Sequence, residues 1–283
     1  MSTKKCLTCI PTNNKVSKTT KKRANWKEER GMTTIFPDDK VPELKGLQTQ
    51  IPRGANQNIE VKLGKKNANR MVLYYAADSY IKKNCKNCEI PDANQAYGNF
   101  KNGGIAKLDS QGNGILKIKC PQAYQEEKKT YPAHVHFILS NAKNDKWVHK
   151  LLTQSVVCEL KYEDVKKIVD AQCALIINAL PFEYYVRNRI PFSVPLDHNL
   201  VPDKLTKKHV VEYISLMLHH CPKIEKSVEK GKIDLMDIPI VIYCYDATCE
   251  ADTDLQQKLN KIGFTNIKVY PGGIMDWRKH YKK

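Results

Sequence analysis

The chain has 283 residues, of which 41% are hydrophobic and 27% are charged, and its formal net charge is +17. This length predicts about two domains, and the apolar content excludes a chain that is disordered throughout. No apolar run reaches the ~18 residues of a membrane span, and no apolar segment follows the first lysines, so we expect neither a transmembrane segment nor a secretory signal. With only ten cysteines, the expectation is a cytoplasmic or otherwise intracellular protein with reduced thiols and no disulfide scaffold.

The positive charge is concentrated at the N-terminus. Residues 1–70 hold 16 basic and 6 acidic side chains, and residues 1–27 hold eight basic side chains and no acidic one. Such a segment repels itself and is attracted to polyanions. Residues 1–27 therefore either bind nucleic acid or another polyanion nonspecifically and in a salt-sensitive way, or form a solvated tail without a partner. Because no periodicity is sustained before residue 51, we predict a basic tail or linker over residues 1–50.

Residues 51–157 have the pattern of a mainly-β, sandwich-like domain. Short segments rich in β-branched and aromatic residues alternate with turn signals, which is typical of antiparallel sheets. Residues 109–114 (DSQGNG) lie between two such segments and predict a hairpin turn. The expected strands cover residues 58–63, 71–75, 105–108, 115–119, 133–139 and 147–160.

From about residue 158 the pattern changes to alternating helices and apolar strands. This alternation predicts an α/β domain on a parallel sheet over residues 158–283. The expected helices cover residues 162–171 and 206–219, the second capped by Thr206, with a third helix face at Leu255, Leu259 and Ile262 and a last helix from Gly272-Gly273. The expected strands cover residues 174–178, 238–243 and 266–270.

Cys244 directly ends the apolar strand Ile240-Val241-Ile242-Tyr243. The carboxyl end of a buried parallel strand faces the following backbone amides and a helix N-terminus. Amides and a helix dipole lower the pKa of a thiol and stabilise a thiolate or a persulfide. The alternative is that Cys244 is a small buried hydrophobic residue, since free cysteine is among the most buried residue types.

The motifs around Cys244 resemble a rhodanese domain, and the resemblance covers about residues 158–283. The C-terminal half of the pattern is found in Ile240–Cys244, Gly263–Ile267, Tyr270–Ile274 and Trp277. The first half is found in Leu175–Leu180, Glu183-Tyr184, Arg189-Ile190-Pro191 and Val194-Pro195. The resemblance implies a sulfurtransferase fold in which Cys244 carries a persulfide and the loop after it cradles the substrate, without a required cofactor. The implied substrate loop consists of Tyr245, Asp246, Ala247, Thr248, Cys249 and Glu250.

Several residues depart from the rhodanese pattern. Asn178 replaces its usual Asp, Leu180 its usual Arg and Asn188 its usual His, and the loop after Cys244 contains no Gly, Lys or Arg. Acidic side chains near the loop raise a thiol pKa and repel thiosulfate, although fixed backbone donors lead us to expect modest net activation of Cys244. Two functions therefore stay open: a sulfurtransferase acting through Cys244, or a catalytically degenerate rhodanese-fold interaction module, for example a virion or polyanion-associated structural protein.

Other cysteines and histidines suggest further sites. Cys249 lies five residues after Cys244, close enough in sequence to resolve an oxidised Cys244 as a redox partner. Two C-x2-C pairs, Cys6/Cys9 and Cys85/Cys88, have zinc-ligand spacing within each pair, but their separation exceeds the usual one. Zinc binding, redox pairing and unrelated thiols are the alternatives. His134 and His136 lie on one face of an expected strand, and with Cys120 and His149 they suggest a metal site or hydrogen-bonded histidines.

Overall fold

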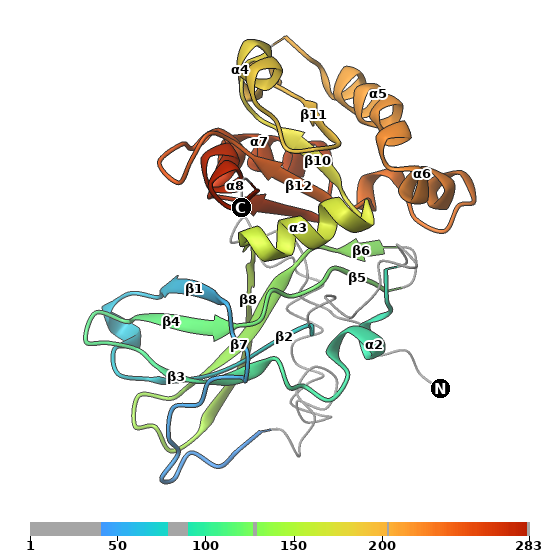
Figure 1. The fold of residues 1–283 in the computed structure, drawn as a ribbon. Coiled ribbons are helices and arrows are strands. Elements are labelled where there is room, and N and C mark those ends of the chain that lie inside the picture. The colour runs from blue at the N-terminus through green and yellow to red at the C-terminus, as the bar shows by residue number, and fades with distance from the viewer. Residues whose placement is uncertain (1–40, 79–89, 127–128, 203, 282–283) are drawn as a thin grey trace. The chain divides into compact units, whose positions relative to one another are not determined.

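The computed structural model describes residues 41–78, 90–126, 129–202 and 204–281. These residues divide into two compact units, the first with residues 41–78 and 91–156 and the second with residues 90 and 157–281 (Figure 1). Within these ranges, no helix has the length and apolar character needed to cross a bilayer.

The first unit is built from antiparallel β-strands, which confirms the mainly-β prediction. Its main sheet has the strand order β3-β2-β7-β8, while β1 pairs with β4 and β5 pairs with β6. The strands are β1 (Gln57–Lys62), β2 (Met71–Ala76), β3 (Gly103–Lys107), β4 (Asn113–Ile118), β5 (Tyr124–Glu126), β6 (Lys129–Tyr131), β7 (His134–Ser140) and β8 (Trp147–Ser155). Two short helices join them, η2 (Lys65–Asn67) and α2 (Ala93–Tyr97).

The predicted turn at residues 109–114 exists, but it does not form a hairpin. Asp109 Oδ1 accepts hydrogen bonds from the N–H groups of Gln111 and Asn113, both at 2.8 Å. The strands on either side belong to different sheets, because β3 pairs with β2 and β4 pairs with β1. Gly112 explains the difference: a Cβ there would lie 2.1 Å from the Gly64 carbonyl oxygen. The turn thus packs directly on the segment that follows β1, and the chain enters β4 already beside β1.

Residues 41–50, which the sequence assigns to the tail, contact this unit. The side chains of Val41, Leu44 and Leu47 are partly buried against its apolar cluster. Gln50 and Ile105 exchange two backbone hydrogen bonds, each 2.9 Å long. This end of the predicted tail therefore packs on the β-unit. The basic residues 1–27 lie outside the described residues.

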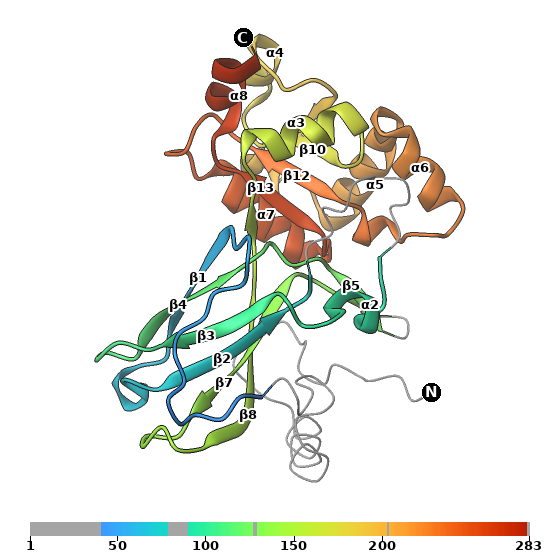
Figure 2. The same cartoon turned by 60° about the horizontal axis from the view of Figure 1, so that its bottom comes forward.

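The second unit contains a five-stranded parallel sheet in the order β11-β10-β12-β13-β9, as the α/β pattern predicts (Figure 2). Its strands are β9 (Cys158–Glu159), β10 (Leu175–Asn178), β11 (Ser193–Pro195), β12 (Ile240–Tyr243) and β13 (Ile267–Tyr270). Its α-helices are α3 (Tyr162–Ala171), α4 (Phe182–Arg187), α5 (Lys207–Met217), α6 (Pro222–Glu229), α7 (Ala251–Ile262) and α8 (Gly273–Tyr281). Short 3-10 turns are η3 (His198–Leu200), η4 (Leu218–His220) and η5 (Leu235–Asp237).

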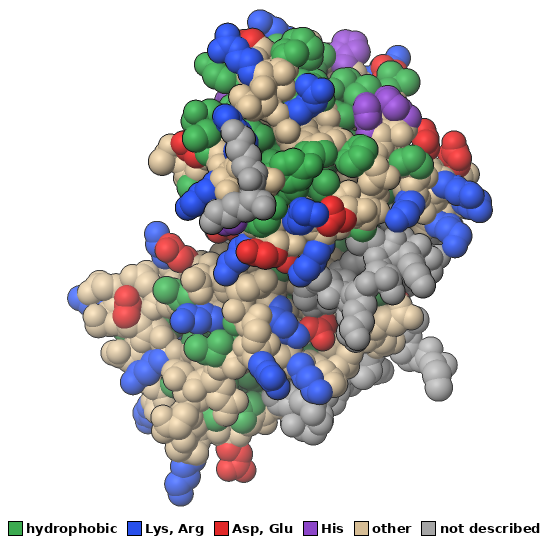
Figure 3. Space-filling model, viewed as in Figure 1, with side chains coloured by type: hydrophobic (Ala, Val, Ile, Leu, Met, Phe, Trp, Pro, Cys, Tyr) green, Lys and Arg blue, Asp and Glu red, His purple; other side chains and the backbone are tan. Residues whose placement is uncertain are grey.

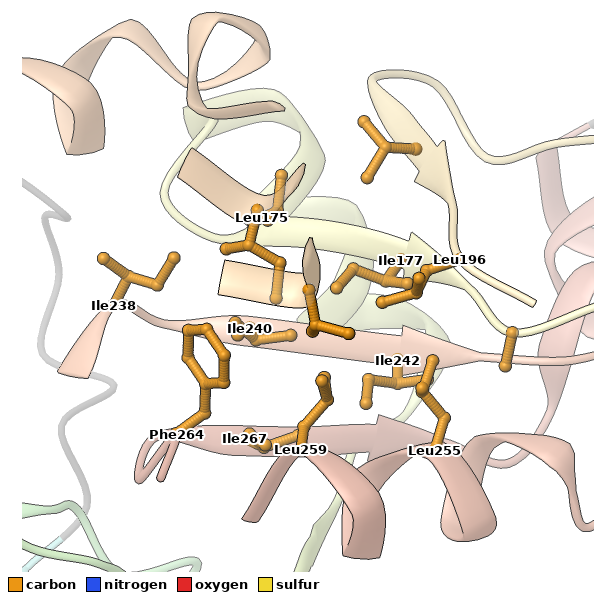
Figure 4. Close-up of a cluster of buried hydrophobic side chains, with 14 of the residues drawn as sticks. Leu175, Ile177, Leu196, Ile238, Ile240, Ile242, Leu255, Leu259, Phe264 and Ile267 are labelled. Atoms are coloured by element: carbon orange, nitrogen blue, oxygen red, sulfur yellow. The ribbon is translucent and has the colours of Figure 1, made fainter. Parts of the chain in front are cut away.

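Apolar cores cover both faces of this sheet. Successive residues of a strand point to opposite faces, so Leu175 and Ile177 join one core while Ile176 joins the other. The first core, drawn in Figure 4, receives side chains from α5, α6 and α7. The second receives side chains from α3 and α8. Burial on both faces is the reason the strands appear in the sequence as continuous apolar runs.

Charges are mixed on the surface drawn in Figure 3. There the Lys and Arg side chains of each unit are scattered among Asp and Glu side chains and uncharged polar surface. Mixed charge attracts a polyanion less than a single-sign patch does. This face therefore gives no support for polyanion binding, which is predicted from residues 1–27 alone.

Candidate active site

Cys244 follows the last residue of β12, the central strand of the parallel sheet. All four residues of β12 are buried, and three of them are β-branched, which favours a strand at this position. The chain then runs through residues 245–250 into α7, which begins at Ala251. The structure therefore brings the predicted cysteine and loop to the carboxyl end of the sheet, where ligand sites of open α/β folds lie.

The loop after Cys244 closes on itself. Asp246 Oδ1 accepts hydrogen bonds from the Thr248 N–H at 3.0 Å and from the Thr248 hydroxyl at 2.7 Å. The Asp246 carbonyl accepts the Cys249 N–H at 3.1 Å. Two loop amides that could have stabilised an anionic sulfur are thus used within the loop, because an Asp side chain readily forms such a local turn.

The Cys244 sulfur faces carbonyl groups. Its Sγ lies 3.3 Å from the Cys249 carbonyl oxygen and 3.6 Å from the Asp246 carbonyl oxygen, so both carbonyls are acceptors within reach of its single S–H group. The Cys244 residue has 0% of its surface exposed. In this conformation the sulfur faces hydrogen-bond acceptors and is shielded from solvent.

Electrostatics at the site oppose a thiolate. Burial raises the pKa of the Cys244 thiol well above its ordinary value, and the Cys249 side chain and the charge of Asp252 raise it further. The backbone N–H of Asp252 opposes this rise. The net effect contradicts the expected activation of Cys244, because desolvation and a nearby carboxylate outweigh the backbone donor. Burial also raises the pKa of Asp252, which is 2% exposed.

Gly273 holds α8 against the loop. Its φ is +60°, and a Cβ at this position would lie 2.5 Å from the Tyr245 carbonyl oxygen and 2.6 Å from that of Cys244. The N–H groups of Ile274 and Met275 donate to these two carbonyls, each at 3.0 Å. Gly273 is therefore needed for a close backbone approach to the first residues of the loop.

Two of the residues that depart from the rhodanese pattern, Asn178 and Leu180, lie at or just after the carboxyl end of β10. Asn178 ends β10 and is paired in register with Tyr243 on β12. Its side-chain oxygen accepts the Leu180 N–H at 2.9 Å. Asn188 lies at the C-terminal end of α4. Asn178 thus organises the backbone beside the cysteine loop, as a short polar side chain at a strand end does.

The described cysteines are in two states. Cys221, Cys244 and Cys249 are not in disulfides. Cys120, Cys158 and Cys173 are disulfide-bonded, which differs from the expectation of reduced thiols throughout. The candidate zinc ligands Cys6, Cys9, Cys85 and Cys88 lie outside the described residues, so the structure does not address that site.

The predicted histidine pair lies together on β7, in the first unit. His134 and His136 are buried, and their Nε2 atoms are 3.1 Å apart. Cys120, one of their two suggested companions, is in a disulfide. Two tyrosines adjoin the pair instead, Tyr97 and Tyr124, each with its hydroxyl 3.3 Å from His134 Nε2. The sequence analysis did not identify these two tyrosines, because no spacing rule connects a histidine to a distant tyrosine such as Tyr97, 37 residues before His134.

The rhodanese-like domain family model matches residues 161–280. Together with the five-stranded parallel sheet and the cysteine at its central strand, this match shows that the C-terminal unit is a rhodanese-like domain. The match leaves the preceding part of the chain without a family.

Among solved structures, the human single-domain sulfurtransferase TSTD1 is 12% identical, with a TM-score of 0.29 over 45% of this chain and 98% of the human chain. The Saccharomyces cerevisiae single-domain sulfurtransferase RDL2 is 14% identical, with a TM-score of 0.32 over 45% of this chain and 94% of its own. The BH2092 protein of Bacillus halodurans is 18% identical, with a TM-score of 0.31 over 44% of this chain and 73% of its own. No curated protein matches the chain. Identities this low transfer no activity or substrate to this protein.

Proposed function

We propose that the rhodanese-like domain transfers sulfane sulfur through a persulfide on Cys244. The observation that carries the proposal is the position of this free thiol, which follows the central strand of the sheet and precedes a loop leading into α7. Open α/β folds bind their ligands at the carboxyl ends of the parallel strands.

The reaction is a two-step transfer through a covalent intermediate. In the first step, Cys244 Sγ attacks the outer sulfur of a donor persulfide, R–S–SH. A new S–S bond forms on Cys244, the S–S bond of the donor breaks, and the donor leaves as the thiol R–SH with the proton that Cys244 gives up. In the second step, an acceptor thiol attacks the outer sulfur and restores the Cys244 thiol. Neither step needs an external oxidant or reductant.

The charges around the sulfur favour an uncharged or protein-bound persulfide over thiosulfate. The acidic residues Asp246, Glu250 and Asp252 follow the cysteine closely in the sequence. Residues 245–250 include no Lys or Arg. Carboxylates without a basic partner repel an anionic donor. Because Cys244 has 0% of its surface exposed, the donor reaches the sulfur only when the loop moves away from it.

Mass spectrometry of the full chain tests this proposal. The reduced protein is incubated with a neutral alkyl persulfide or with thiosulfate, and the peptide containing Cys244 is analysed for one additional sulfur atom. We expect more added sulfur from the persulfide than from thiosulfate. Cys244→Ser abolishes the transfer to an acceptor thiol, because serine cannot hold a sulfane sulfur. The matched control is Cys221→Ser, which removes another buried cysteine of the same unit that is not in a disulfide and leaves the transfer intact.

Cys249 is proposed as the resolving thiol of an oxidised Cys244. Its carbonyl lies 3.3 Å from Cys244 Sγ, and its side chain contributes to the raised pKa of Cys244. One equivalent of hydrogen peroxide converts the two thiols to a disulfide and two waters. Cys249→Ser therefore keeps sulfur transfer but forms no intramolecular disulfide at Cys244 under peroxide. A disulfide that persists at Cys244 in this variant contradicts the assignment.

A non-catalytic interaction module is the second candidate function. The full burial of Cys244 and its raised pKa favour it, since a buried thiol is usually inert. The same experiment separates the two candidates. If wild type and Cys244→Ser transfer no sulfur from any donor, the enzymatic proposal is wrong and the domain acts by binding alone.

A further inference from the structure

Three side chains of the first unit each place a nitrogen or oxygen atom close to the Nε2 atom of His134. His134 and His136 lie two residues apart on β7 and share one face of the strand. Tyr97 is the last residue of α2, and Tyr124 is the first residue of β5. Both tyrosine hydroxyls lie 3.3 Å from His134 Nε2, and His136 Nε2 lies 3.1 Å from it.

The cluster is buried in apolar surroundings. His136 and Tyr124 are 0% exposed, His134 is 4% exposed and Tyr97 is 9% exposed. The two tyrosines belong to an apolar cluster that also contains buried alanines. Burying several polar groups together is costly unless they share partners or hold an ion. In the described part of the chain, no three side chains drawn from His, Cys, Asp and Glu could hold a metal, so tyrosine oxygens supply the further donors here.

The second ring nitrogen of each histidine is held by a neighbour. His134 Nδ1 lies 2.6 Å from the Pro132 carbonyl oxygen. A carbonyl only accepts hydrogen bonds, so the neutral ring carries its proton on Nδ1 and directs the Nε2 lone pair into the cluster. His136 Nδ1 lies 2.7 Å from the hydroxyl of Thr153, the residue opposite it on β8. Metal-binding histidines are characteristically fixed in this way through their other nitrogen.

The Nε2 atom of His134 is the centre of this cluster. It faces two hydroxyl oxygens and a second ring nitrogen. A ring nitrogen has one lone pair and accepts one strong hydrogen bond, whereas a cation bound at this point can interact with several donor atoms at once.

The three separations from His134 Nε2 fit those between ligand atoms of one metal ion. For metal–nitrogen bonds of about 2.0–2.1 Å, neighbouring ligand atoms lie about 3.3–3.4 Å apart in a tetrahedral site and about 2.8–3.0 Å apart at right angles. The observed separations of 3.1 Å and 3.3 Å fall in this range.

We infer that Tyr97, Tyr124, His134 and His136 form a mononuclear metal site that binds ferric iron. Imidazole nitrogen suits iron, copper, nickel and zinc, and hard anionic oxygen favours the harder, more highly charged ion among them. Two phenolates add two negative charges to an apolar site, and a trivalent cation offsets them best. As each oxygen binds the ion, the tyrosine releases its phenol proton to solvent. This site is independent of Cys244 and of the sulfur-transfer proposal.

Titration of the full chain with iron tests the inference. Chelator-treated protein receives ferric citrate, and the excess is removed by gel filtration. We expect about one iron per chain by elemental analysis, with the visible charge-transfer absorption that phenolate bound to ferric iron produces. The double variant Tyr97→Phe, Tyr124→Phe keeps both rings but loses this absorption. Tyr131→Phe is the matched control, because its ring stacks on that of Tyr124 at 5.4 Å between centroids and it should keep the absorption.

Other results overturn the inference. The inference is wrong if the wild-type protein retains no iron. It is also wrong if the double variant absorbs as strongly as the wild type. Exclusive uptake of zinc or copper(II) from an equal mixture with ferric citrate shows that the ion is assigned wrongly. Circular dichroism of each iron-free variant establishes that it is folded, and His134→Gln gives a second loss of absorption that does not depend on the tyrosine substitutions.

Discussion

Replacing Gly273 with alanine should destabilise the rhodanese-like domain through a backbone clash beside Cys244. The new Cβ would lie 2.5 Å from the Tyr245 carbonyl oxygen and 2.6 Å from that of Cys244. Both carbonyls are held by hydrogen bonds from α8, so the loop cannot move without losing them. Gly231 provides a matched control, because its φ of +64° is nearly the same and nothing lies within 4 Å of its added Cβ.

The two variants separate the conformational cost from the clash. An L-residue in the left-handed region costs about 1–2 kcal/mol, which is the whole expected effect of Gly231→Ala. Overpacking adds about 1–3 kcal/mol, so Gly273→Ala should cost about 2–5 kcal/mol. The two changes lie in the same unit, and their difference therefore measures the contact with the loop carbonyls.

Urea unfolding provides the assay. The second unit has one tryptophan, Trp277, so its fluorescence reports on this unit when Trp26 and Trp147 are replaced by Phe. We expect a lower transition midpoint for Gly273→Ala than for Gly231→Ala, with similar slopes. Equal free energies of unfolding for the two variants would refute the argument that Gly273 is required by close approach.

Three further changes test the pKa shifts and the core. Asp252→Asn removes a negative charge that raises the pKa of Cys244. Iodoacetamide at pH 8 should therefore alkylate Cys244 faster in this variant, as followed by peptide mass spectrometry, and an unchanged rate contradicts the charge effect. Leu255→Ala empties a fully buried position and should cost about 2–5 kcal/mol in urea unfolding, whereas Leu216→Ala, at a residue 69% exposed, should change stability by less than about 0.5 kcal/mol. Burial raises the pKa of Tyr74 from 10.0 to about 12. As the pH rises, the unfolded chain therefore loses the Tyr74 proton first, and the free energy of unfolding should fall between those pH values. Tyr74→Phe should show a smaller fall, and an identical pH profile would exclude Tyr74 as its cause.

Several elements of the C-terminal domain could be predicted because their signals are local, whereas the short helices α4 and α6 were not predicted. Residues 175–178 and 240–243 are buried on both faces, and such strands leave continuous apolar runs in the sequence. Thr206 precedes α5 and accepts the N–H of His209, as a capping residue does. The order of these elements, together with Gly272-Gly273, was enough to place Cys244 at the end of a buried parallel strand, whereas the structure shows that this strand is the central one.

The chemistry of Cys244 depends on contacts that periodicity does not report. The sequence places the thiol near a loop and a helix N-terminus, which favours activation. The structure instead directs the thiol at carbonyl oxygens, because Asp246 binds the Thr248 N–H within the loop. Desolvation of the sulfur and the proximity of Asp252 then set the direction of the pKa shift, and both are properties of the packed molecule.

In the N-terminal part, the sequence alone determined that the segment is mainly β and that His134 and His136 share a strand face, since both follow from a period of two residues. Only the tertiary structure decided that β4 pairs with β1 and that Tyr97 and Tyr124 meet the histidines. The physical reason is that the spacing of apolar residues in the sequence shows which face of an element is buried. Which other element covers that face depends on packing between residues that lie far apart in the chain.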